Sequence, residues 1–147
     1  MQAGRLASRS QRTLVMSLPT SLGFAGALSL VNLWLAYRCV RIRLNGPGGV
    51  GDLGIPSLLA RMRAHANFVE YTPFVLILMA LLEYAGESRT WLQGLGAVYI
   101  VGRIVHAFGI ERPKFTMQLI GSLVTWAVLL GLAVWALWLA IRYSTAA

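Results

Sequence analysis

The chain has few acidic residues, few histidines and a single cysteine. Five Asp and Glu residues stand against 13 Lys and Arg residues, and there are two histidines and one cysteine in 147 residues. The lone Cys39 excludes an internal disulfide and is expected to be a small buried side chain, while one histidine per helix makes no metal site. Charged residues make up only 12% of the chain and hydrophobic residues 57%, which excludes an ordinary soluble domain and is typical of a compact membrane bundle.

The excess of positive charge, a formal net charge of +8, would suggest a nucleic-acid partner in a soluble protein. In this chain the arginines lie beside apolar runs, a pattern that suits membrane-flanking loops and anionic lipid headgroups. We therefore predict a multi-pass integral membrane protein that contacts membrane lipids and binds no nucleic acid. If the source is bacterial, the membrane is the cell inner membrane.

Four apolar segments are long enough to cross about 30 Å of hydrocarbon at about 1.5 Å per residue. They cover residues 18–40, 68–84, 91–110 and 117–141. The second helix is expected to begin near Ser57, after Pro56, so that polar residues occupy its first turns. A glycine-rich loop, 45–54, joins the first two spans, and the later connections are short. The predicted fold class is an all-α integral membrane protein, an up-down bundle of four transmembrane helices.

The domain organisation predicted is a single four-helix membrane domain over residues 16–147, preceded by a basic extension over residues 1–15. We hypothesise that translation starts at Met16, a hypothesis that an intact Met1 terminus in mass spectrometry of the natively expressed protein would contradict. A signal peptide is disfavoured because the apolar run is too long and lacks a convincing cleavage site.

Basic residues mark one end of the predicted bundle as cytoplasmic. That end carries Arg38, Arg41, Arg43, Arg61, Arg63, Arg112 and Lys114. The opposite end carries Arg5, Arg9, Arg12, Arg89 and Arg142.

A polar stripe enters the second span, where ionisable groups are functional-site candidates because their placement in a bilayer is unfavourable. At about 100° per residue, Arg63, Asn67 and Glu70 share one helical face. Arg61 and His65 point to nearly the opposite side, and His65 is expected to contact a neighbouring subunit or lipid headgroups.

A second stripe in the third span consists of Tyr99, Arg103, His106 and Ile110. The first span supplies Arg38 and Arg41 at the same end of the bundle. A basic, partly dry pocket that opens to the cytoplasm is therefore predicted. Arginines bind carboxylates with paired hydrogen bonds, and surplus positive charge lowers the pKa of a bound thiol, so the pocket suits a small peptide-like anion.

Structural alternatives stay open for several of these residues. Arg103 and Glu70 would also make an interhelical ion pair, and His106 would also serve as a packing histidine. Glu83 and Glu87 are expected to be solvated at the far interface.

Two segments of the sequence carry a family resemblance. They are the second-span residues Arg63, Asn67, Glu70, Tyr71 and Pro73, and the third-span stretch Gly102-Arg103-Ile104-Val105-His106-Ala107. Together they resemble the MAPEG family, the membrane-associated proteins in eicosanoid and glutathione metabolism. The resemblance covers residues 18 to about 141. Members of this family include microsomal glutathione transferases, leukotriene and prostaglandin synthases, and a non-enzymatic lipoxygenase-activating protein. The resemblance implies a homotrimer that holds glutathione between adjacent subunits at the cytoplasmic side.

Carried over by position, the resemblance assigns glutathione contacts to Arg63, Asn67, Glu70 and Tyr71. Arg41 resembles the arginine at the end of the family's first span, and Arg38 is the alternative candidate for the same position. Arg103 and His106 match third-span positions near the ligand and are the catalytic candidates.

The chain departs from the family pattern at three positions. Ile110 stands where several members carry tyrosine, and Met117 and Gln118 stand where the synthases place a thiolate-stabilising arginine. Only Arg112 or Lys114 of the preceding loop would replace that arginine. The prediction is a glutathione-dependent transferase or peroxidase for lipophilic electrophiles, and the alternative is a non-catalytic protein that binds lipid or glutathione.

Overall fold

The computed structural model describes residues 18–46, 48–111 and 115–146, which form four helices. These are α2 (Pro19–Leu44), α3 (Pro56–Tyr84), α4 (Arg89–Glu111) and α5 (Phe115–Ala146). Each helix is long and apolar enough to cross a membrane. The predicted all-α bundle with four spans is therefore confirmed. The predictions for Met16 and for residues 1–15, Arg112 and Lys114 fall outside the described residues.

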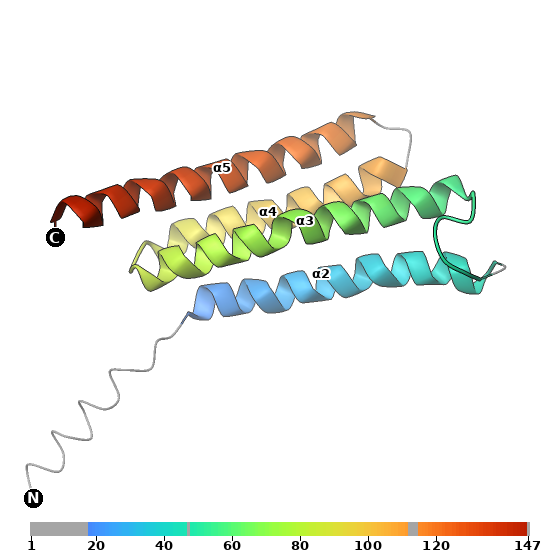
Figure 1. Cartoon of the computed structure of the whole chain (residues 1–147), viewed down its shortest axis with the longest axis horizontal. Helices are drawn as coiled ribbons and strands as arrows, with labels where there is room; N and C mark the ends of the chain where they lie inside the picture. The colour runs from blue at the N-terminus through green and yellow to red at the C-terminus, as the bar shows by residue number, and fades with distance from the viewer. Residues whose placement is uncertain (1–17, 47, 112–114, 147) are drawn as a thin grey trace, which may run out of the picture.

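Successive helices run antiparallel, with α3 and α4 between α2 and α5 (Figure 1). Within the described residues no Cα atom of α2 lies within 8 Å of a Cα atom of α5. The first residues of α3 and α5 lie at the same end as the last residues of α2 and α4 (Figure 1). We call this the basic end, because Arg38, Arg41, Arg43, Arg61 and Arg63 lie toward it. As predicted for Cys39, its side chain is buried, with 5% of its surface exposed.

Glycines bring the backbones of α4 and α5 into close contact. A Cβ atom placed on Gly102 would lie 2.6 Å from Cγ1 of Val124, and one on Gly109 would meet the backbone of Gln118. A Cβ atom on Gly121 would lie 2.7 Å from the backbone nitrogen of His106. At Gly109 and Gly121 the nearest atoms include backbone, so a side chain would force one helix to move against the other, whereas at Gly102 the Val124 side chain would have to shift.

Glu83 is buried, with 7% of its surface exposed, so the prediction that it is solvated is wrong. Its carboxylate accepts hydrogen bonds from the backbone N–H groups of Thr20, at 2.9 Å, and Ser21, at 2.8 Å, and from the Ser21 hydroxyl at 2.8 Å. The N-cap residue of α2 is Leu18, which provides no side-chain acceptor. Glu83 therefore supplies, from the C-terminal end of α3, the acceptor and negative charge that the first turn of α2 lacks.

The Glu83→Gln variant is expected to be less stable than the wild type by about 1–2 kcal/mol, because an amide loses the negative charge and one of the two acceptor oxygens. Thermal unfolding in detergent, followed by circular dichroism, measures the effect. Glu87→Gln, which neutralises an acid at the same end, is the control. Equal melting temperatures for the two variants would contradict the capping role.

Candidate functional site

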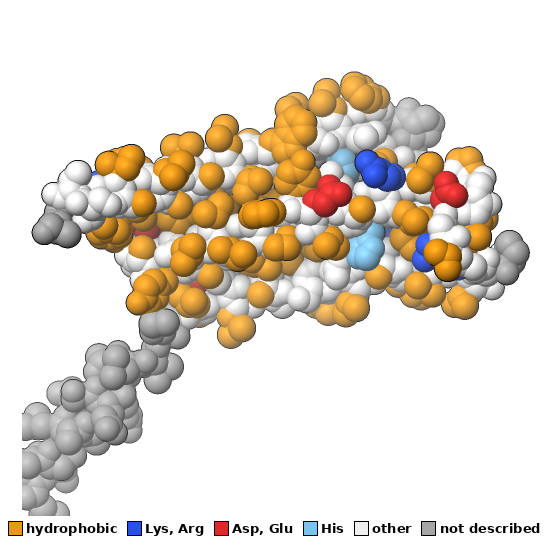
Figure 2. All heavy atoms as spheres, in the orientation of Figure 1, with side chains coloured by type: hydrophobic (Ala, Val, Ile, Leu, Met, Phe, Trp, Pro, Cys, Tyr) orange, Lys and Arg blue, Asp and Glu red, His pale blue; other side chains and the backbone are white. Residues whose placement is uncertain are grey.

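A polar pocket of about 200 Å³ lies between α3, α4 and α5 toward the basic end. Its lining consists of Arg63, Asn67, Glu70, His106, Ile110, Gln118 and Ser122. Figure 2 shows one face of the molecule, on which most of the visible charged and histidine side chains gather toward the basic end of an otherwise hydrophobic surface. The pocket therefore offers hydrogen-bonding and charged groups on a bundle whose outer surface otherwise suits lipid.

Helical spacing explains how three elements supply this lining. Arg63, Asn67 and Glu70 lie one turn apart along α3, as predicted. His106 and Ile110 are four residues apart on α4, and so are Gln118 and Ser122 on α5. The structure thus brings the predicted second-span stripe next to His106, while the binding of a ligand by these residues stays a prediction.

His106 is fixed at the wall shared by α4 and α5. Its side chain is buried, with 3% exposed, and its Nδ1 atom lies 3.2 Å from the backbone oxygen of Gln118 and 3.2 Å from the hydroxyl oxygen of Ser122. Nε2 is enclosed and has no hydrogen-bond partner among the described residues. The ring is therefore anchored through Nδ1 alone.

Arg103 lies behind the pocket and is not part of its lining. Only 1% of its surface is exposed, and its Nη1 donates a hydrogen bond to Oγ1 of Thr125 at 3.1 Å. The guanidinium carbon is 5.9 Å from the centre of the Phe68 ring. In the part of the chain that the structure describes, no ion pair joins Arg103 to Glu70, so the alternative of a direct pair is not observed. A buried cation thus stands next to the polar pocket.

The remaining predicted ligand residues lie outside the pocket within one chain. Arg38 forms an ion pair with Glu111, and Arg41 is exposed near the end of α2. The Tyr71 hydroxyl accepts a hydrogen bond from Nε1 of Trp126 at 3.2 Å. A single chain therefore brings together only part of the predicted ligand set.

The opposite polar side of α3 binds neighbouring helices of the same chain. Arg61 Nε lies 2.8 Å from a Glu111 carboxylate oxygen, and Arg61 Nη1 donates to the backbone oxygen of Arg38 at 2.8 Å. His65 donates from Nε2 to Oδ1 of Asn32 at 2.9 Å. His65 is therefore tied to α2 within the chain, while its expected contact with a neighbouring subunit or lipid headgroups stays a prediction.

Two pocket residues, Gln118 and Ser122, were not identified as site residues from the sequence. Their spacing of four residues near the start of α5 was the available signal. That signal is weak, because the pairing of this turn with His106 depends on the α4–α5 contact. Glu111 lies just beyond the predicted span 91–110, whereas in the structure it is the last residue of α4 and binds two arginines.

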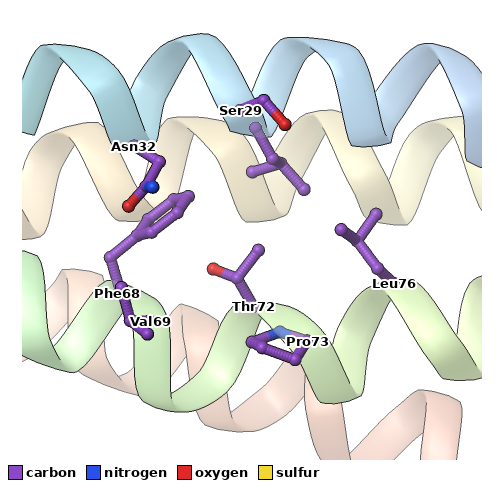
Figure 3. Close-up of a pocket in the computed structure, with 8 residues that line it drawn as sticks. Ser29, Asn32, Phe68, Val69, Thr72, Pro73 and Leu76 are labelled. Atoms are coloured by element: carbon purple, nitrogen blue, oxygen red, sulfur yellow. The ribbon is translucent and has the colours of Figure 1, made fainter.

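A separate, mainly apolar groove of about 270 Å³ lies between α2 and α3. Its lining includes Ser29, Asn32, Phe68, Val69, Thr72, Pro73 and Leu76 (Figure 3). The Thr72 hydroxyl is engaged with the Tyr99 hydroxyl at 2.9 Å. This groove shares no residue with the polar pocket, and it suits an apolar occupant rather than a charged one.

Comparison with known proteins gives two consistent results. The profile of the MAPEG family matches residues 21–138, a region that reaches from the first turn of α2 far into α5. Inner membrane protein YecN of Escherichia coli strain K12 is 31% identical over 116 residues, which are 78% of this chain and 88% of YecN. YecN of Escherichia coli O6:H1 strain CFT073 matches equally, with 31% identity over 116 residues.

Proposed function

Because this chain belongs to the MAPEG family of membrane proteins in eicosanoid and glutathione metabolism, we propose that it is a glutathione-dependent transferase or peroxidase for lipophilic electrophiles. As a member of this family with four candidate spans, it is a multi-pass integral membrane protein. The observation that carries the proposal is the convergence of Arg63, Asn67 and Glu70 with His106 in one polar pocket.

The chemistry of the pocket matches the groups of glutathione, which has two carboxylates, an ammonium group, two amides and a thiol. Arg63 suits a carboxylate through paired, charge-assisted hydrogen bonds. Glu70 suits the ammonium group, and Asn67 suits a peptide amide. The positive charge of Arg103 behind the pocket favours the thiolate over the thiol. Catalysis would consist mainly of thiolate stabilisation and positioning against an electrophile that arrives from the lipid.

The proposal includes a homotrimer, the assembly that the family resemblance implies. Glu70 is exposed near the middle of α3, and Arg63 is exposed two turns earlier. In lipid, a charged side chain at the centre of a span costs about 2.5–3.5 kcal/mol, so this face favours coverage by another copy or by water. The pocket of about 200 Å³ is also smaller than the roughly 300–1,000 Å³ of most small-molecule sites. An adjacent subunit would complete it, with Arg38 or Arg41 as the contributed cation.

Titration calorimetry of reduced glutathione into the detergent-purified protein tests the proposal. Saturable binding is expected, followed by conjugation or reduction of an apolar electrophile in lipid vesicles. The absence of saturable binding would overturn the proposal.

Binding without turnover would instead establish the second candidate, a non-catalytic protein that holds glutathione or a lipid. Two pocket residues favour this alternative. Ile110 lines the pocket without a hydroxyl, and Gln118 provides no cation at the turn where the synthases of the family place an arginine. Turnover assays on the wild-type protein therefore decide between the two functions.

A further inference from the structure

We infer that the Ser122 hydroxyl is the hydrogen-bond donor that holds the sulfur of a bound thiol, a role that rests on the proposed function. Ser122 lines the polar pocket, is half-buried and lies on the same helix face as Gln118, four residues earlier. Ser122 lies one helical turn after Gln118, at the start of α5, where the synthases of the family place the thiolate-stabilising arginine that this chain lacks. The inference assigns the thiol to the α5 wall and the charged ends of the ligand to α3.

The tautomer of His106 leaves the Ser122 proton free. A carbonyl oxygen only accepts hydrogen bonds, so the contact between Nδ1 and the Gln118 oxygen requires a proton on Nδ1. A proton on Nε2 would instead be a buried donor without a partner, which is unfavourable. With Nδ1 as the donor, the oxygen of Ser122 accepts from the ring at 3.2 Å. The hydroxyl hydrogen is then not used by His106.

The backbone does not take up that hydrogen either. The hydroxyls of Ser29, Thr125 and Ser144 each donate to the carbonyl four residues earlier in their helix, at 2.8 Å. Ser122 is different, because its hydrogen-bond partner among the described residues is His106 alone. The hydroxyl of Ser122 is therefore held in place as an acceptor while its donor capacity stays available to the pocket.

His106 and Ser122 have different roles because a ligand in the pocket can reach only one of them. His106 Nε2 is enclosed, so the ring acts on a ligand through Ser122 and is a positioning residue. Ser122 also lies one turn from Thr125, which holds the guanidinium of Arg103 at 3.1 Å. A thiolate at Ser122 would thus have a hydroxyl donor in contact and a buried cation nearby. When the S–H bond ionises, the proton leaves to solvent through the pocket opening, and the Ser122 hydroxyl remains protonated.

The test is the ultraviolet thiolate absorbance of bound glutathione as a function of pH. Ser122→Ala is expected to weaken the acidity of the bound thiol about tenfold, which raises the midpoint by about one pH unit, because a hydrogen bond to a charged atom is lost. Ser122→Thr should restore the wild-type midpoint. Ser144→Ala, the same change at the far end of the same helix, should leave it unaltered. The ionisable side chains in the pocket lining are Arg63 and Glu70 on α3 and His106 on α4, with none from α5, and the Ser122 and Ser144 variants keep all three.

Binding of S-methylglutathione, which has no thiol proton, separates ligand binding from ionisation and should be unchanged in Ser122→Ala. An unaltered midpoint in a Ser122→Ala protein that binds S-methylglutathione would overturn this inference and leave the proposed function intact. If the wild type binds neither ligand, the proposed function itself fails, and the inference fails with it. If Ser122→Ala does not fold, His106→Leu removes the group that orients the hydroxyl. A raised midpoint with retained S-methylglutathione binding then supports the inference, and an unaltered one overturns it.

Discussion

Replacement of Gly109 by alanine is expected to destabilise the folded protein by about 1–3 kcal/mol or more, because the added methyl group overpacks a backbone contact. The Cβ atom would meet the backbone of Met117 and Gln118 at the start of α5. A backbone cannot rotate away as a side chain can, so α4 and α5 must separate. The measurement is the melting temperature in detergent, together with the yield of monodisperse protein in size-exclusion chromatography.

Gly94→Ala is the matched control, because it makes the same change in the same helix at a position with nothing within 4 Å of the new atom. Alanine is favoured over glycine inside a helix by about 1 kcal/mol, so this variant should be as stable as the wild type or slightly more stable. If Gly109→Ala matched Gly94→Ala in melting temperature, the close approach of α4 and α5 would be refuted.

The Arg63→Ala variant is expected to bind glutathione about tenfold to a hundredfold more weakly, because a charge-assisted hydrogen bond to a carboxylate is lost. Titration calorimetry measures the change. Arg63→Lys should recover only part of the affinity, since an ammonium group cannot make the paired contact of a guanidinium.

Arg142→Ala provides the charge-matched control. Arg142 lies toward the opposite end of the molecule, where its guanidinium carbon is 4.6 Å from the centre of the Trp138 ring. Its removal should leave glutathione affinity unchanged. An equal loss of affinity in both arginine variants would indicate a general charge effect. No loss of affinity in Arg63→Ala would contradict the assignment of the glutathione contacts to α3.

The sequence predicted those features that depend on neighbouring residues. Apolar length placed the four spans, and Pro56 marked the first turn of α3 within one residue of the expected start. Helical periodicity placed Arg63, Asn67 and Glu70 on one face, because side chains one turn apart along a helix must share a side.

Contacts between distant segments were not predictable in this way. Glu83 looked like a solvated acid because its partners, the first residues of α2, lie about 60 residues earlier in the chain. His65 finds Asn32 across the α2–α3 contact, a pairing that periodicity cannot reveal. The contact of Ser122 with His106 likewise depends on the glycine-mediated packing of α5 against α4.

The capping of α2 by Glu83 bears on how the protein is made. The first span is synthesised before the residue that completes its hydrogen bonds, because Glu83 lies near the end of α3. Until then the amide groups of Thr20 and Ser21 must be hydrated or bound to other partners. We therefore expect α2 and α3 to reach their final positions in the bilayer together. Insertion of α3 would then determine how deeply α2 lies in the membrane.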